Sequence, residues 1–232
     1  MTAITTKHEE KALKEKKVAV VTGGASGIGL ATGKMLAKRG YIVISADRYA
    51  ETTRGQNRKF RTRACDVRSR EEVESLFQWV KQRFGRLDVL VNCAGVHYSS
   101  RRIHEENVGD FVRLVRTNIY GVYCCCHEAL KLMKKGVIVN IGSSVGTAAD
   151  PAAAAYSASK AWVIQFTKCL AQQYGKTVRC NTVSPGPVDT PFLRNAFGND
   201  PAALEQIKKF NPAGRIATPE EIADTIVHVI EN

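Results

Sequence analysis

Tyr156 and Lys160 have the residue types and the spacing of a proton-transfer pair. They stand four residues apart in a segment that predicts a helix, so the phenol and the ammonium lie on one face, one turn apart. A free tyrosine has a pKa of about 10 and is a poor acid or base at neutral pH, but a nearby cation favours the phenolate. With a serine from the preceding Gly-Ser-Ser-x-Gly turn, the pair could exchange a proton with a substrate oxygen. The same spacing occurs in helices without chemistry, so this interpretation requires a hydride carrier elsewhere in the chain.

A glycine-rich turn near the N-terminus predicts a site for a phosphate-bearing cofactor. The run from Val18 to Thr22 is typical of a buried strand, and the turn from Gly23 to Gly29 opens an amphipathic helix that ends near Arg39. Glycines let the backbone approach a pyrophosphate, and the helix N-terminus offers free N–H groups to the anion. The pattern is Thr-Gly-x-x-x-Gly-x-Gly, rather than the Gly-x-Gly-x-x-Gly of other dinucleotide folds.

The next strand, Tyr41 to Ala46, ends at Asp47, which bears on the choice of dinucleotide. An acid at this place accepts hydrogen bonds from the adenosine ribose hydroxyls and repels a 2′-phosphate, which favours NAD. Arg48 and the basic run at 54–63 could instead attract that phosphate. The sequence therefore favours NAD and keeps NADP as the alternative.

Strands and helices alternate along the rest of the chain. The patterns predict strands at 59–65, 87–92, 136–141 and 177–183, and helices that start at Ser69, Asp110, Tyr156 and Thr218. Ser69-Arg-Glu-Glu72 and Thr218-Pro-Glu-Glu221 are expected to be capping boxes. Together these elements predict an α/β fold, a single-domain doubly wound parallel sheet of the Rossmann type, with helices on both faces and ligands at the carboxyl ends of the strands.

Composition and length set further limits. Residues 17–232 are expected to form the domain, after a mobile lead-in at 1–16 that resembles neither a secretory signal nor a transit peptide, and short helical pieces over 191–214 are expected to form a substrate lid. No apolar stretch reaches the ~18 residues that a membrane span requires. The seven cysteines form no CxxC pair, which favours buried thiols in a reducing cytoplasm over a zinc site near His127, so no metal is expected.

The net charge of +12 raises two alternatives. A nucleic-acid surface is one interpretation of the basic run, but no nucleic-acid-binding motif accompanies it, so no nucleic-acid partner is expected. His97, Arg101 and Arg102 in a polar loop could recruit an acidic substrate, although a solvated loop is the favoured interpretation.

Taken together, these segments resemble the short-chain dehydrogenase/reductase family. The resemblance covers about residues 17–231 and rests on motifs in family order and spacing: Thr22 to Gly29, Asp66, Asn92 to Gly95, Asn118, Ser143, Tyr156-x-x-x-Lys160 and Pro185 to Thr190. It implies hydride transfer between a nicotinamide and a carbon that bears a hydroxyl or carbonyl oxygen.

The resemblance also implies a role for each matching residue. Tyr156 exchanges the proton with the substrate oxygen, and Lys160 lowers the tyrosine pKa and holds the nicotinamide ribose. Ser143, rather than Ser144, bonds the substrate oxygen, and Asn118 supports a water-mediated proton relay through Lys160. Asp66 and Val67 flank the adenine, and the other implied cofactor contacts are Gly23, Ser26, Gly27, Ile28, Gly29, Asp47, Arg48, Asn92, Ala94, Gly95, Tyr156, Lys160, Pro185, Gly186, Val188 and Thr190.

Two features depart from the family pattern. Cys93 replaces the usual Asn before Ala-Gly, which a small residue should tolerate, and the final seventh strand is absent from the sequence. The family expectation remains a homodimer or homotetramer.

The sequence thus predicts a cytoplasmic NAD(H)-dependent oxidoreductase that interconverts a neutral secondary alcohol and a ketone. Small apolar residues after Ser143, at Ala148, Ala149 and 151–155, are expected to line the substrate pocket. The alternatives are an NADP(H)-dependent carbonyl reductase and a non-catalytic dinucleotide-sensing protein, although such sensors tend to lose the Tyr or the Lys.

Overall fold

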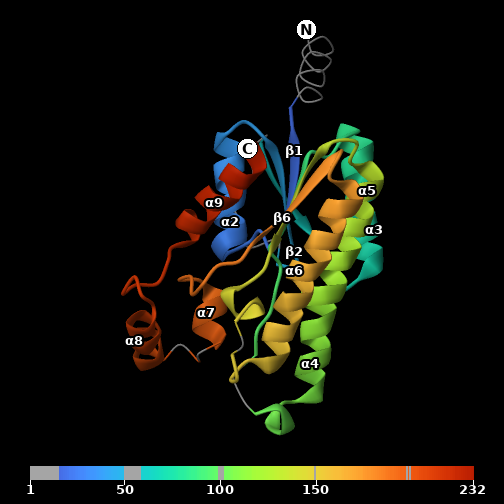
Figure 1. Cartoon of the computed structure of the whole chain (residues 1–232). Coiled ribbons are helices and arrows are strands. Elements are labelled where there is room, and N and C mark those ends of the chain that lie inside the picture. Colours follow the sequence, from blue (N-terminus) through green and yellow to red (C-terminus); the bar gives the residue numbers. More distant parts are fainter. Residues whose placement is uncertain (1–15, 50–58, 99–101, 149, 197, 199) are drawn as a thin grey trace.

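Six parallel strands form one sheet in the order β3-β2-β1-β4-β5-β6 (Figure 1). The computed structural model describes residues 16–49, 59–98, 102–148, 150–196, 198 and 200–232. Predictions made for residues up to 15 and for Arg54, Arg58, Arg101 and Ala149 lie outside these ranges. The strands are β1 (Val18–Thr22), β2 (Ile42–Asp47), β3 (Phe60–Ala64), β4 (Val89–Asn92), β5 (Gly136–Ile141) and β6 (Val178–Val183).

The order of the strands reverses between β1 and β4, which places a crevice there. β1 pairs with β2 on one side and with β4 on the other, in parallel register from Ala19↔Val89 to Thr22↔Asn92. The central strands are apolar runs rich in Val and Ile because both of their faces are covered, and all five residues of β1 are buried. In an open parallel sheet, ligands bind outside the carboxyl ends of the strands at such a reversal.

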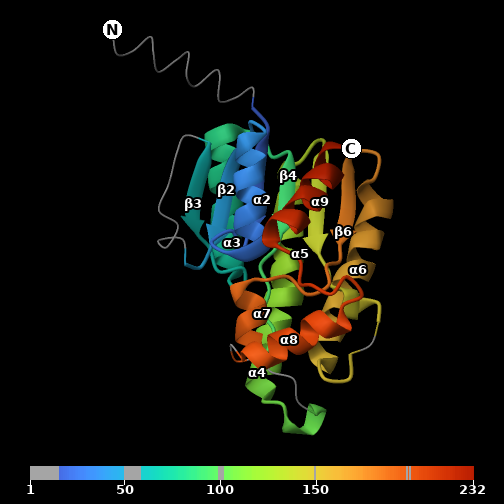
Figure 2. The same ribbon diagram turned by 90° about the vertical axis from the view of Figure 1, so that its left-hand side faces the viewer.

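Helices cover both faces of the sheet, as the sequence predicts (Figures 1 and 2). One face carries α2 (Gly27–Lys38) and α9 (Pro219–Glu231), whose Leu36 and Ile226 are buried in one apolar cluster with β1 and β5. The other face carries α3 (Arg70–Phe84), α5 (Val122–Leu132) and α6 (Ala154–Tyr174), which share the larger cluster. The sheet is therefore the middle of three layers.

The helix predicted from Asp110 begins two residues earlier and changes its winding midway. It consists of α4 (Val108–Val115), a π-helical segment η3 (Arg116–Gly121) and α5. π-helical turns interrupt α-helices mostly at functional sites, and Asn118 lies inside this one. Short 3-10 turns, η2 (Ile103–Glu105) and η4 (Ser144–Gly146), precede α4 and α6.

The two predicted capping boxes differ in outcome. At Thr218 the box is complete: the hydroxyl accepts from Glu221 N, and the Glu221 carboxylate accepts from Thr218 N at 2.8 Å. At Ser69 only half of it forms, because the Glu72 carboxylate accepts from Asp66 N at 2.8 Å instead. That hydrogen bond joins the start of α3 to the turn after β3.

The chain crosses the carboxyl edge of the sheet again in α7 (Pro191–Ala196) and α8 (Pro201–Phe210) (Figure 2). The last helix, α9, is fastened to the edge strand by Arg179 of β6, which donates to the carbonyls of Val229 and Ile230 at 2.9 and 2.8 Å. Across the described ranges, none of the helices has the length and apolar character needed to cross a membrane.

Candidate active site

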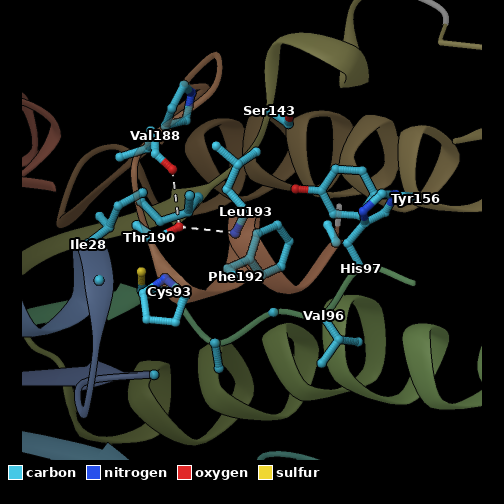
Figure 3. Close-up of a pocket in the computed structure, with 18 of the residues that line it drawn as sticks. Ile28, Cys93, Val96, His97, Ser143, Tyr156, Val188, Thr190, Phe192 and Leu193 are labelled. Carbon is cyan, nitrogen blue, oxygen red and sulfur yellow. Dashed lines mark hydrogen bonds between the residues drawn. The ribbon is translucent and has the colours of Figure 1, made fainter. Parts of the chain in front are cut away.

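A cavity of about 1340 Å³ opens at the carboxyl ends of the strands. It brings together residues from both halves of the sheet and from α6, α7 and α8. Of the predicted site residues, the following line it: Gly23, Ser26, Gly27, Ile28, Asp47, Arg48, Asp66, Val67, Ala94, Gly95, Ser143, Tyr156, Lys160, Pro185, Gly186, Val188 and Thr190. Figure 3 shows part of this wall, with Ser143, Tyr156, His97 and Phe192 near one another.

The turn between β1 and α2 has the backbone that a close approach by phosphate requires. Gly23 and Gly27 have φ values of 65° and 51°, which side chains other than hydrogen rarely permit. A Cβ on Gly23 would lie 2.8 Å from Ala94 N, and one on Gly27 would lie 3.0 Å from Thr190 Cγ2. No side chain caps α2 at Ser26, so its first N–H groups remain available to an anion. This cradle fits the pyrophosphate of a dinucleotide.

Asp47 and Arg48 end β2 at the same side of the cavity. Asp47 Oδ2 accepts from Ala25 N at 3.2 Å, and its Oδ1 accepts from Tyr49 N at 3.0 Å. The carboxylate is therefore held against the glycine turn. The Arg48 guanidinium lies 4.6 Å from the centre of the Tyr49 ring. Asp47, which favours NAD, and Arg48, which could favour NADP, therefore both line the cavity.

Asp66 forms an ion pair with Arg68, which no motif in the sequence predicts. Arg68 Nε lies 2.9 Å from both carboxylate oxygens, and this hydrogen bonding lowers the pKa of Asp66. Arg68 itself lines the cavity beside Val67. In the sequence, only the position of Arg68 two residues after Asp66, the predicted adenine contact, could have indicated this.

Tyr156, Lys160 and Ser143 lie together in the cavity, and burial is the largest influence on the pKa values of Tyr156 and Lys160. Burial raises the pKa of Tyr156 to about 12, while a hydrogen bond with Ser143 acts to lower it. Lys160 Nζ lies 5.7 Å from the centre of the Tyr156 ring and donates to Ile141 O at 2.7 Å. Burial lowers the pKa of Lys160 to about 8. In this geometry the phenol is protonated near neutral pH, and the hydrogen bond with Ser143 acts to lower its pKa.

Three predicted site residues, Asn118, Asn92 and Gly29, are not among the residues that line this cavity. Each of them lies next to residues that do, or holds the strands behind them. Asn118 is fully buried, and its Oδ1 lies 3.5 Å from the point where a Cβ on Gly95 would be, with Lys160 Nζ 3.8 Å from the same point. Asn92 donates to Asn140 Oδ1 at 2.9 Å, which joins β4 to β5. A Cβ on Gly29 would meet Gly23 O at 2.3 Å, so this glycine allows the turn to close.

The corner after β6 is held by Thr190. Its hydroxyl donates to Val188 O at 3.2 Å and accepts from Leu193 N at 3.3 Å (Figure 3). Val188 also forms a parallel bridge with Ala217. The corner is thereby connected both to the start of α7 and to the segment before α9.

This fold and site agree with the known family. The family model for short chain dehydrogenases matches residues 17–200. The chain is a short-chain dehydrogenase.

Relatives and solved structures support the same conclusion. A 3beta-hydroxysteroid dehydrogenase of Mediterraneibacter gnavus is 33% identical over 92% of this chain and 88% of its own length. The 3-ketoacyl-(acyl-carrier-protein) reductase of Brucella melitensis, solved with NADH, has a TM-score of 0.85 at 27% identity and covers 92% of this chain and 90% of its own. A variant of actinorhodin polyketide ketoreductase, solved with NADPH, has a TM-score of 0.87 at 34% identity, with 94% and 91% covered. The protein is thus an NAD(P)-dependent oxidoreductase.

In this short-chain dehydrogenase, the small residues predicted for the substrate wall divide between two neighbouring pockets. Of the described residues among 148–155, Asp150 and Ala153 line the larger cavity, Ala152, Ala153 and Ala155 line a pocket of about 210 Å³ beside it, and Ala148 is exposed. Most of the apolar wall comes from elsewhere, since Val145 and four residues of α7 and α8 line it: Phe192, Leu193, Ala196 and Ile207. These residues carry no motif, so only the way α7 and α8 pack reveals them.

In the polar loop after β4, some residues line the cavity and others do not. His97 and Tyr98 line the cavity of this dehydrogenase, whereas Arg102 is exposed and is not among the lining residues. Cys93, at the family's usual Asn position, lines it too, and burial raises the pKa of its thiol to about 12. The thiol is therefore neutral at physiological pH.

Proposed function

We propose that this dehydrogenase interconverts a neutral secondary alcohol and a ketone with NAD(H). The observation that carries the proposal is the position of Tyr156, which shares one cavity with Ser143 and Lys160 at one end and with the Gly23–Gly27 turn and Asp47 at the other. A bound nicotinamide would supply or accept the hydride. The chain's own groups would orient the substrate oxygen and move the proton.

The protonated state of Tyr156 supports a role as general acid in ketone reduction. A phenol with a pKa of about 12 holds its proton until a substrate oxygen gains negative charge. Ser143 would bond the same oxygen, and Lys160 would stabilise the phenolate left on the tyrosine. In the direction of alcohol oxidation, the same phenolate would accept the hydroxyl proton. Asn118 would support proton return through a water beside Gly95 and Lys160.

Asp47 supports NAD over NADP. Its carboxylate is fixed at the end of β2 by Ala25 N and Tyr49 N, where it would accept the ribose hydroxyls and repel a 2′-phosphate. Arg48 lines the same region and supports the alternative, an NADP(H)-dependent carbonyl reductase. Titration of both cofactors tests this point, and a tenfold or larger preference for NADP would contradict the proposal.

The walls of the cavity support a neutral substrate. Val145, Leu193 and Ile207 are apolar, and the carboxylate of Asp150 would repel an anion. Residues of α7 and α8 line the cavity, so we include the predicted lid at 191–214 in the proposal: it would exclude water during transfer.

The wider setting is also part of the proposal. We expect a homodimer or homotetramer, and the large apolar side chains exposed along α4, η3 and α5 support it: Val108, Phe111, Val112, Tyr120 and Tyr123. Light scattering on the purified protein tests the oligomer.

We also expect a cytoplasmic location. All seven cysteines are free, and five of them are buried, which suits a reducing cytoplasm.

The function is tested by a panel of ketones and secondary alcohols with NADH or NAD⁺, followed by cofactor absorbance. We expect turnover of neutral compounds. Selective turnover of charged sugar acids would contradict the neutral-substrate part of the proposal, and failure of every compound with either cofactor would contradict its catalytic part.

A further inference from the structure

Three aromatic rings meet at the substrate end of the cavity. The ring centre of His97 lies 4.7 Å from that of Tyr156 and 6.3 Å from that of Phe192, and the Tyr156 and Phe192 centres lie 6.0 Å apart. The rings come from the loop after β4, from α6 and from α7 (Figure 3). The His97 and Phe192 rings therefore flank the Tyr156 phenol from segments far apart in the sequence.

His97 brings an imidazole to a corner that also contains the Ser143 hydroxyl and the Asp150 carboxylate. Its side chain lines the cavity, and it has neither a hydrogen bond nor an ion pair with the residues that the structure describes. Burial lowers the pKa of His97, and Asp150 opposes that effect only in part. A neutral imidazole has one N–H donor and one nitrogen acceptor, so it can bond a hydroxyl or a carbonyl group.

The other two rings set the shape of the space. Phe192 and Tyr156 are tilted at 47°, and His97 and Tyr156 at 60°, so each presents a face or an edge to a flat neighbour. Such faces pack well against a ring, whereas a flexible chain loses more rotational freedom when it is held in the same space.

We propose that the cluster of His97, Tyr156 and Phe192 selects cyclic ketones and alcohols that carry a second polar group on the ring. The ring packs beside Phe192, its carbonyl oxygen bonds the Tyr156 hydroxyl, and the second group bonds the His97 imidazole. His97 and Phe192 are thus specificity residues for the same reaction. This inference rests on the proposed function and names its substrate class.

Three probes of increasing match separate these features: 2-hexanone, cyclohexanone and 4-hydroxycyclohexanone, each with saturating NADH. We expect the wild type to prefer them in rising order of kcat/KM. In His97→Phe, which keeps a ring but loses the hydrogen bond, the ratio of kcat/KM for 4-hydroxycyclohexanone to that for cyclohexanone should fall about tenfold. In Phe192→Leu, which keeps apolar bulk but loses the ring, the ratio for cyclohexanone to 2-hexanone should fall several-fold.

If His97 and Phe192 only fill space, the variants give a different result. Both variants would then change all three values of kcat/KM by one common factor, and unchanged ratios would overturn the inference. Ile103→Ala, at an exposed position of η2 outside the cavity, is the control for general disturbance of this region, and we expect its ratios to match those of the wild type.

A binding measurement keeps the two proposals distinguishable. If the wild type reduces none of the probes, the proposed function fails on that panel, but ¹⁵N-histidine NMR still tests the inference. With NADH present, the His97 ring resonances, assigned by their absence in His97→Phe, should shift with 4-hydroxycyclohexanone more than with cyclohexanone. Equal or absent shifts would overturn it.

Discussion

The side chain of Asn118 and the backbone of Val96 form a pair of hydrogen bonds across 22 residues of chain. Val96 N donates to Asn118 Oδ1, and Asn118 Nδ2 donates to Val96 O, both at 2.9 Å. The same Nδ2 donates to Ser159 Oγ at 3.2 Å. One buried amide thus joins the loop after β4 and the π-helical segment to α6, the helix that carries Tyr156 and Lys160.

Replacing Asn118 with Leu should therefore destabilise the protein. The Val96 N–H and C=O groups would lose their partner, at about 1 to 3 kcal/mol for each group that stays buried. We expect a loss of about 2 to 4 kcal/mol in the free energy of unfolding by urea denaturation. Asn195→Leu, at an exposed asparagine of α7, is the matched control. A loss no greater than that of the control would show that the pair is not structural.

Gly23 should be intolerant of even one methyl group for two separable reasons. Gly85 has nearly the same φ, 69° against 65°, but a Cβ there meets nothing within 4 Å. Gly85→Ala should cost only the left-handed backbone, about 1 to 2 kcal/mol. Gly23→Ala should cost more and weaken NAD binding at least tenfold, because its Cβ would contact Ala94 N. Similar losses of stability, with NAD affinity intact in both variants, would argue against a close approach at the turn.

Asp47 and Arg48 should act in opposite directions on cofactor choice. Asp47→Ala removes the repulsion of a 2′-phosphate, so the ratio of NAD to NADP affinity should fall by about tenfold or more. Arg48→Ala should raise that ratio. Fluorescence titration with NADH and NADPH measures both. If neither substitution changes the ratio, the dinucleotide is selected elsewhere in the cavity.

Lys160 should reduce stability at neutral pH because it is a buried cation. Its pKa falls from 10.5 to about 8 on folding, so the unfolded chain binds more protons between those two values and stability rises with pH across that window. Below pH 8 the whole cost is present. Lys160→Met should therefore be more stable than the wild type at pH 7, by about 1 to 3 kcal/mol after loss of the hydrogen bond to Ile141 O.

The pH dependence provides the check on Lys160. The stability difference between Lys160→Met and the wild type should shrink as the pH rises from 8 to 10.5. A difference that is constant with pH would mean that Lys160 is not the titrating group. Lys160→Met should also lose turnover. Higher stability with lost turnover would show that Lys160 is kept for function although it destabilises the fold.

The core of the fold was predictable because its signals are local. Apolar runs rich in β-branched residues, such as Val18–Thr22, are typical of a covered parallel sheet, and glycines mark the turn between β1 and α2. The π-helical turn around Asn118 was not predictable, because its winding depends on partners at Val96 and Ser159. The incomplete box at Ser69 has the same cause, since Glu72 bonds Asp66 N instead.

The candidate site divides in the same way. Tyr156 and Lys160 are neighbours on one helix, so their spacing was enough to suggest chemistry. The rings of His97 and Phe192 meet Tyr156 only after three distant segments pack together, and no spacing in the sequence relates them. The raised pKa of Tyr156 likewise depends on burial, which a residue type does not reveal.

Tyr156→Phe is the most direct test of the central claim, that this phenol moves the proton during hydride transfer. The variant keeps the ring that packs against His97 and Phe192 but lacks the hydroxyl. With a substrate from the panel, we expect kcat to fall by at least about a thousandfold, while NADH affinity by fluorescence titration stays within about threefold of the wild type. Turnover that survives at a tenth of the wild-type rate or more would contradict the mechanism.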